Sequence, residues 1–270
     1  MIIEQRMADT AIIQTHFCLD DSPWFRMIEL DSTDSTNQFL QNYQDNPERR
    51  ITLVSAEYQT AGRGSGTNTW ESAQGQNLLF SLLTHPRWQP PTQMYALSEV
   101  AALAVCRALD DFVPGFQVKW PNDIYYADTK VVGMLIENKL RGNQIDRCII
   151  GIGLNVNQTR FLSDAPNPCS LALIMGHSVE RRFVLERVME HFTHLYDRLE
   201  HGRAEDIHAA YLDKLYRKGE MHTYRDAEGA FRATLTDVLP DGHAVLVDEE
   251  GRTRTYAFKE VSYIINNKTT

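Results

Sequence analysis

Hydrophobic and polar positions divide the chain into continuous apolar runs, amphipathic stretches and, towards the end, short alternating segments. Apolar runs bounded by polar turns predict buried strands, here residues 24–30, 51–58, 77–84, 116–118, 124–126, 131–140 and 145–157. Apolar residues at helical spacing predict helices, here a short one after Ser35, a buried one over 93–112, a short one from Ser170, a long amphipathic one over 180–200 and a last one over 203–218. The pattern predicts a β-sheet flanked by helices.

The pattern changes at Gly219. Beyond it, apolar and polar residues alternate in short runs separated by turns, at 221–225, 231–239, 244–248 and 253–258. Such runs predict a small antiparallel β unit with the strand spacing of a barrel. About 50 residues are too few for a robust core, so this unit should dock on the rest of the chain. We therefore expect two domains, residues 1–218 and 219–270.

Composition and charge narrow the class of protein. The 270 residues carry a net charge of −9 and the pI is about 5.5, which argues against broad binding to nucleic acid or to an anionic membrane. The sequence shows no secretory signal pattern and no apolar run long enough to span a bilayer. The four scattered cysteines predict reduced thiols and a cytoplasmic location. Residues 1–21 are too few for a helix-turn-helix, so we expect no DNA-binding domain.

The richest stretch for chemistry is Lys119–Glu137, which reads KWPNDIYYADTKVVGMLIE. It predicts a strand, a hairpin and a return strand. Pro121 lacks an N–H, so it should end the first strand. Asn122 and Asp123 then lie at a strand end, with Lys130 near the start of the next strand. Two lysines, one carboxylate and one amide at the same rim favour a binding site over an ordinary charged hairpin tip.

A polar run, Asp31–Asn37, precedes the first short helix. Ser35 with Gln38 fits a capping box, so the run could simply cap the helix. The same hydroxyls and backbone N–H groups could also form a cradle for a neutral ring with both donors and acceptors, such as a ureido group. The residues alone leave both interpretations open.

A glycine-rich loop spans Gln59–Trp70. No Gly-Lys-Ser/Thr follows, so it is not a Walker A loop, and it lacks the third glycine of a dinucleotide fingerprint. Glycines around Arg63 would let the backbone close over a ligand while the guanidinium grips a carboxylate or phosphate. A flexible surface loop is the alternative. Gly151 and Gly153 interrupt a later strand, which indicates either a bulge or the close approach of a ligand or neighbour.

These motifs together resemble the biotin–protein ligases, from about Trp24 to the end of the chain. They are KWPND with Lys130 and Val131-Val132-Gly133, Ser35-Thr36-Asn37, Gly62-Arg63-Gly64, and Gly151-x-Gly153-x-Asn155. The chain departs from the family at Ser65-Gly66-Thr67, where many members carry a further arginine. The resemblance implies an α+β fold, a mixed sheet flanked by helices as in class II aminoacyl-tRNA synthetases, with a small C-terminal SH3-like barrel.

The resemblance also implies a two-step reaction. Biotin and ATP give biotinyl-5′-AMP and pyrophosphate, and a lysine of a biotin carboxyl carrier protein then takes the biotinyl group. The implied biotin site is Ser35, Thr36, Asn37, Gln59, Gly62, Arg63, Gly64, Lys130 and Gly133. The implied nucleotide site is Arg63, Trp70, Lys119, Asn122, Lys130 and Asn155. The implied catalytic groups are Lys130, Arg63, Lys119 and Asp123, with Mg²⁺ at Asp123.

Three alternatives compete with this hypothesis. A lipoate or octanoate ligase of the same fold would favour a long apolar tunnel over a ureido cradle. A non-catalytic biotin or nucleotide sensor would keep the cradle without needing Lys130. A regulator acting on DNA is disfavoured by the charge. For the oligomeric state we expect a monomer or a weak homodimer.

Overall fold

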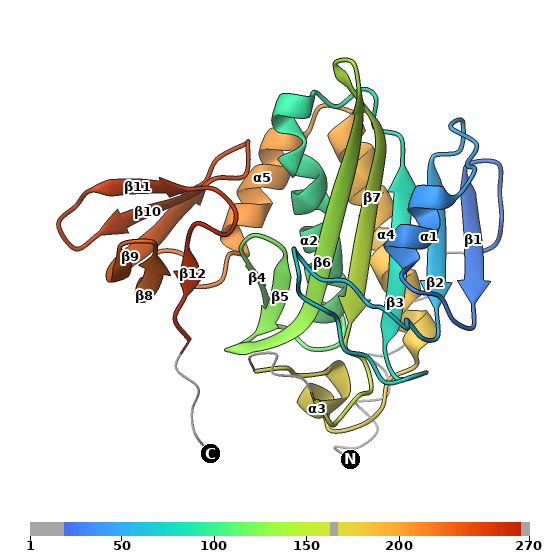
Figure 1. Ribbon diagram of the computed structural model, residues 1–270, viewed down its shortest axis with the longest axis horizontal. Coiled ribbons are helices and arrows are strands. Elements are labelled where there is room, and N and C mark those ends of the chain that lie inside the picture. Colours follow the sequence, from blue (N-terminus) through green and yellow to red (C-terminus); the bar gives the residue numbers. More distant parts are fainter. Residues whose placement is uncertain (1–18, 163–166, 266–270) are drawn as a thin grey trace, which may run out of the picture.

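The computed structural model describes residues 19–162 and 167–265, so the segment before Leu19, on which the absence of a DNA-binding domain was predicted, lies outside the described residues. Its centre is a seven-stranded sheet with the order β1-β2-β3-β7-β6-β5-β4 (Figure 1). β1 runs parallel to β2, and every other neighbouring pair is antiparallel. The strands are β1 (Phe25–Leu30), β2 (Ile51–Ala56), β3 (Leu78–Thr84), β4 (Phe116–Lys119), β5 (Asp123–Tyr126), β6 (Thr129–Arg141) and β7 (Gln144–Leu154).

Helices cover the two faces of this sheet unequally. α2 (Tyr95–Asp110) and α4 (Arg181–Glu200) pack on one face, with α5 (Ala204–Asp213) against α2, whereas the short α1 (Thr36–Asn42) lies on the opposite face (Figure 1). A 3₁₀ turn, η2 (Pro91–Gln93), precedes α2, and α3 (Leu171–Met175) lies between β7 and α4. No helix in the described ranges combines the length and apolarity that crossing a membrane requires.

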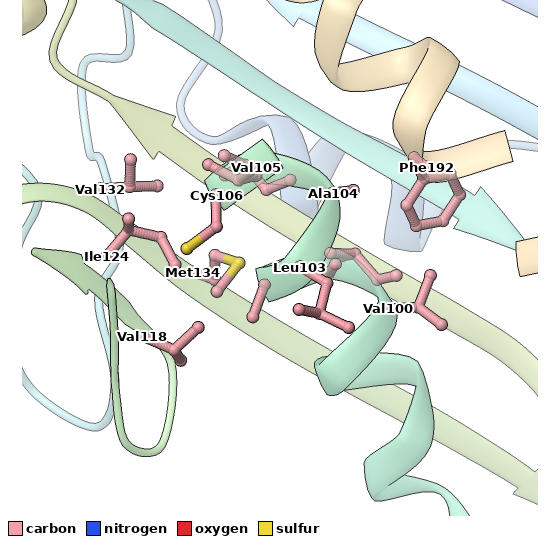
Figure 2. Close-up of a cluster of buried hydrophobic side chains, with 14 of the residues drawn as sticks. Val100, Leu103, Ala104, Val105, Cys106, Val118, Ile124, Val132, Met134 and Phe192 are labelled. Carbon is pink, nitrogen blue, oxygen red and sulfur yellow. The ribbon is translucent and has the colours of Figure 1, made fainter. Parts of the chain in front are cut away.

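The main core lies between the sheet and α2. Apolar residues surround almost the whole circumference of α2, so it can be buried between the strands and α4. Figure 2 shows Val100 and Leu103 of α2 near Phe192 of α4, with Ile124 and Met134 on the strands. All five are 3% exposed or less. This face is therefore a closed apolar core.

The C-terminal residues form a second, five-stranded antiparallel sheet with the order β11-β10-β9-β8-β12. Its strands are β8 (Met221–Asp226), β9 (Gly229–Val238), β10 (Ala244–Asp248), β11 (Thr253–Tyr256) and β12 (Ser262–Tyr263). It docks beside β4 and β5, where the indole Nε1–H of Trp120 donates to the Gly242 carbonyl at 2.9 Å. In the described part of the chain no pairing of β11 with β12 closes this sheet, so the predicted barrel is not confirmed.

Several local predictions need correction. The helix predicted over 203–218 ends at Asp213, because residues after it leave the helix to pair with the edge strand β4: Val118 N–H donates to the Lys214 carbonyl, and Tyr216 N–H donates back to Val118. Ser35 does precede α1, but its side chain makes no capping bond, so the capping-box prediction is wrong. The strand β12 was not predicted. The end of β4 before Pro121 and the β5–β6 hairpin are as predicted.

Candidate active site

Two rows of residues cross the sheet on the face that carries α1. In the first row Gly151 of β7 lies between Ser81 of β3 and Leu135 of β6, and in the second Gly153 lies between Leu79 and Gly133. Side chains alternate between the faces of a strand, so these rows lie two residues apart on one face. Each row has a glycine where a side chain would otherwise project, which leaves a shallow seat on the sheet.

Asn37 of α1 occupies the first seat. A Cβ at Gly151 would lie 2.2 Å from Asn37 Oδ1, so only glycine permits this approach. Asn37 Nδ2 donates to the Leu135 carbonyl at 3.1 Å and to Glu137 Oε2 at 2.8 Å, while Ser81 Oγ lies 2.6 Å from Asn37 Oδ1. The close approach predicted for this glycine is therefore made by a neighbouring side chain.

The start of α1 forms a cradle with Gln59. Gln59 Oε1 accepts from the Thr36 backbone N–H at 2.8 Å and lies 3.0 Å from Thr36 Oγ1. A residue from another segment thus satisfies a helix N–H that a capping side chain would normally take. Because Ser35 makes no capping bond, its hydroxyl is left for the cavity that it lines.

The glycine-arginine loop forms a small hairpin. Trp70 N–H donates to the Gly62 carbonyl at 2.9 Å, and Gly64 N–H donates to the Asn68 carbonyl at 2.8 Å. Arg63 faces Glu137, with 3.2 Å between Nη2 and Oε1. A Cβ at Gly62 would lie 2.6 Å from the Trp70 carbonyl oxygen, so a glycine is needed for the hairpin to close.

Trp70, at the end of the loop, occupies the second seat. Added Cβ atoms at Gly153 and Gly133 would lie 2.4 Å and 2.7 Å from its ring. Lys130 Nζ lies 5.7 Å from the ring centroid, within the range of a cation–π contact. Trp70 Nε1 is buried without a hydrogen-bond partner. The indole thus forms one wall of the site next to the catalytic lysine candidate.

Lys119, Asp123 and Lys130 form the charged rim predicted from the β4–β6 segment. Lys130 Nζ lies 2.7 Å from Asp123 Oδ1, and Lys119 Nζ lies 4.0 Å from Asp123 Oδ2. Lys119 Nζ also lies over the rings of Tyr125 and Tyr263, at 5.3 and 4.7 Å from their centroids. Burial lowers the pKa of Lys119, although Asp123 acts in the opposite direction. Two cations therefore share one carboxylate, which leaves positive charge available to an anion.

The predicted residues converge on a cavity of about 970 Å³. All of them line it except Gly62, which supports the hairpin instead; the lining set is Ser35, Thr36, Asn37, Gln59, Arg63, Gly64, Trp70, Lys119, Asn122, Asp123, Lys130, Gly133 and Asn155. Sequence reasoning missed Lys259 and Tyr263 of the C-terminal region, which also line the cavity. It also missed Ser81 and Glu137, because in an apolar strand neither differs from an ordinary polar position.

Two asparagines of the cavity differ in what they leave free. The side-chain Nδ2 of Asn122 donates to the Met134 carbonyl, and the backbone carbonyl of Asn122 accepts from the Met134 N–H at 2.9 Å. This residue therefore braces β6. Asn155 donates from Nδ2 to the Cys169 carbonyl at 3.0 Å, while its Oδ1 is buried without a partner. Buried acceptors are normally satisfied, so Asn155 Oδ1 is the better candidate for a ligand contact.

Comparison with known proteins agrees with this fold. A model of the biotin/lipoate A/B protein ligase family matches residues 29–155. The bifunctional ligase/repressor BirA of Bacillus subtilis is 30% identical over 239 residues, covering 86% of this chain and 72% of BirA. A biotin–[acetyl-CoA-carboxylase] ligase of Paracoccus denitrificans is 27% identical over 206 residues, covering 74% of this chain and 85% of that one.

Solved structures give the same result. The biotin protein ligase of Aquifex aeolicus, in complex with biotin and ATP, superposes with a TM-score of 0.73 at 29% identity, covering 88% of this chain and 97% of that one. Fold and site thus define a ligase of the biotin/lipoate class. Within that class, the chain belongs to the biotin–protein ligase family.

Proposed function

We propose that this protein activates biotin with ATP as biotinyl-5′-AMP and transfers the biotinyl group to a lysine of a biotin carboxyl carrier domain. The observation that carries the proposal is the convergence of three groups on one cavity. They are a neutral polar cradle at the start of α1, the guanidinium of Arg63 and the ammonium of Lys130. A neutral ring, a carboxylate and a phosphate are the chemical groups that this set would hold.

The first step joins two anions, so positive charge is its main requirement. A carboxylate oxygen of biotin attacks the α-phosphorus of ATP, and the bond to the bridging oxygen breaks to release pyrophosphate. Lys130 and Arg63 would offset the repulsion between carboxylate and phosphate and stabilise the charge that develops at phosphorus. Lys119 would hold the β- and γ-phosphates of ATP. In the second step the carrier amine attacks the acyl carbon, AMP leaves, and the amine loses a proton.

The two substrates would bind beside the two side chains that fill the seats, biotin near Asn37 and the nucleotide near Trp70. The ureido ring would be held by Ser35, Thr36, Asn37 and Gln59. Gly62 and Gly64 would let the loop close over the side chain of biotin, and Gly133 would leave room beside Lys130. Asn155 Oδ1 would accept from the adenine amino group, and Trp70 would cover the nucleotide. Asn122 would act mainly by bracing β6.

The residues present allow Mg²⁺ only in company with ATP. The described residues contain no group of three or more His, Cys, Asp or Glu side chains that could hold a metal. Magnesium usually takes one or two carboxylates together with substrate phosphates. Asp123 fits that habit, although it would share its carboxylate with Lys130. The ion would supply charge neutralisation on the phosphates.

Some features of the biological setting are also part of the proposal. We place the reaction in the cytoplasm, which the free thiols of Cys106, Cys148 and Cys169 support. Residues 1–218 would form the catalytic domain and 219–270 a separate SH3-like unit. The protein would be a monomer or a weak homodimer, with β1, an edge strand of the seven-stranded sheet, as the contact between two copies.

The test is pyrophosphate release from ATP and Mg²⁺ with either biotin or lipoate, with and without a carrier domain. Biotin-dependent release, followed by label on the carrier lysine, is the expected result. Release with lipoate alone would instead support the lipoate ligase. Biotin binding without turnover would support the non-catalytic sensor.

A further inference from the structure

Glu137 of β6 contacts two residues that line the cavity, Asn37 and Arg63. One carboxylate oxygen, Oε2, accepts from Asn37 Nδ2 at 2.8 Å, and the other, Oε1, lies 3.2 Å from Arg63 Nη2. Asn37 belongs to the polar cradle and Arg63 to the loop. A single side chain on β6 therefore contacts both the group proposed for the ureido ring and the group proposed for the carboxylate.

The surroundings of Asn37 fix the direction of a chain of hydrogen bonds. Its Nδ2 faces a carboxylate and a carbonyl, which only accept, so its Oδ1 must face Ser81. Ser81 therefore donates its one hydroxyl hydrogen to Asn37. Because that hydrogen is used, the 2.7 Å contact between Ser81 Oγ and Thr36 Oγ1 needs the hydrogen of Thr36. Thr36 therefore donates to Ser81 rather than to Gln59 Oε1, which lies further away at 3.0 Å.

The consequence is a cradle of defined polarity. With its hydrogen committed to Ser81, Thr36 Oγ1 offers the cavity only lone pairs, so it can accept from a ligand N–H but cannot donate. Thr36, Asn37 and Ser81 are 4%, 3% and 0% exposed, so water does not readily exchange with this chain. The polarity ends on the negative charge of Glu137, and charged acceptors make the stronger bonds.

We propose that Glu137 is a positioning residue that sets this polarity, selects a head group that donates N–H bonds, and holds Arg63 over the site until a substrate carboxylate arrives. The inference rests on the proposed function. The Arg63 guanidinium is 42% exposed, and exposed ion pairs are weak, so a substrate carboxylate can displace Glu137 from Arg63. The bond from Asn37 Nδ2 persists, because it uses the other carboxylate oxygen of Glu137, Oε2.

Two substitutions at this position separate its two contacts. Glu137→Gln can still accept from Asn37 through its carbonyl oxygen but loses the ion pair with Arg63. Glu137→Ala loses both. Biotin binding measured by calorimetry without ATP should weaken by roughly tenfold to a hundredfold in the alanine variant, and by about threefold or less in the glutamine variant. The KM for ATP should stay within about twofold in both.

Ser81→Ala provides an independent break in the same chain. It should weaken biotin binding to a similar extent, and the double variant with Glu137→Ala should be no worse than either single variant, because contacts in one network are not additive. Glu200→Gln is the matched control. Glu200 lies at the end of α4, and the substitution removes a carboxylate that lies 2.8 Å from Arg50. This variant should bind biotin as the wild type does.

The outcomes are distinct. Wild-type affinity for biotin in Glu137→Ala, or additive losses in the double variant, would overturn the role given to Glu137. Equal losses of biotin and ATP affinity would indicate a general structural role and also overturn the proposal. So would a Glu137→Gln variant that binds biotin as weakly as Glu137→Ala. Failure of the wild-type protein to bind biotin would reject the proposed function itself, and the inference with it.

Discussion

The two faces of the seven-stranded sheet use neighbouring residues of the same strands for opposite purposes. Phe80 of β3 is fully buried in the main core, while the next residue, Ser81, faces Asn37 and the site. On the helix side nearly every position is apolar and packed. On the site side the strands give up side chains at Gly133, Gly151 and Gly153. Stability and function are thus separated by the alternation of the strands rather than by distance along the chain.

Truncation on the helix side should have the largest effect. Phe80→Ala leaves a cavity in the core and should lower the free energy of unfolding by about 3–5 kcal/mol, measured by denaturant unfolding. The KM values of the protein that remains folded should stay near wild type. Ser81→Ala, one residue along, is the matched comparison and should cost only about 1 kcal/mol of stability. Similar stability losses for the two variants would contradict the division between faces.

Removal of the central ammonium on the site side should have the next largest effect. Lys130→Ala should lower the rate of pyrophosphate release by roughly a hundredfold to a thousandfold, since one fixed electrostatic group at a transition state has about that effect. The fold should survive, because Lys130 Nζ makes its main contact with Asp123 at the cavity rim. Steady-state assays would measure the rate of pyrophosphate release, and thermal unfolding would show that the fold survives. Near-normal release would remove Lys130 from the mechanism.

The glycine seats should give intermediate and distinguishable effects. Gly151→Ala places a Cβ 2.2 Å from Asn37 Oδ1 and should raise the KM for biotin by about tenfold or more, because Asn37 must move. Gly153→Ala places a Cβ 2.4 Å from Trp70 Cε2 and should instead displace the indole. Quenching or shift of tryptophan fluorescence, compared between the two variants, would report that displacement. The same kinetic defect in both would mean that the seats do not act separately.

How far the sequence could predict this site depends on how local each feature is. Arg63 with its glycines, Ser35-Thr36-Asn37 and Lys130 are contiguous motifs, so their chemistry was visible before the fold. The seat of Asn37 was not, because it depends on the register that sets Ser81, Gly151 and Leu135 side by side. Residues far apart in sequence meet there, and no local pattern encodes that register.

The same limit explains the other errors. A strand position such as Glu137 looks like an ordinary solvent-facing residue until α1 and the loop are placed against it. The helix predicted over 203–218 was too long because its pattern could not show that β4 would offer an edge to Lys214 and Tyr216. The alternation of apolar and polar residues in short runs predicted the second sheet. It could not show whether the sheet closes into a barrel, because closure depends on which edge strands pair.

The smallest expected effect concerns the charge of Lys119 and pH. Burial lowers the pKa of Lys119 below its ordinary 10.5, so alkaline pH should discharge it before an exposed lysine. Affinity for ATP should then fall by about fivefold, the value of one charge contact of ~1 kcal/mol. Lys119→Arg should remove this pH dependence, because a guanidinium stays charged throughout.

Stability should change in the opposite direction from ATP affinity, which separates discharge of Lys119 from alkaline unfolding. Between the lowered folded pKa of Lys119 and its higher unfolded pKa, the unfolded chain binds more protons, so this residue's contribution makes folding more favourable as pH rises. The ATP site therefore weakens while the fold gains from the same deprotonation. Parallel loss of ATP affinity and of stability, or an unchanged pH profile in Lys119→Arg, would show that another group titrates. The experiment measures ATP binding and unfolding on the same samples across the alkaline range.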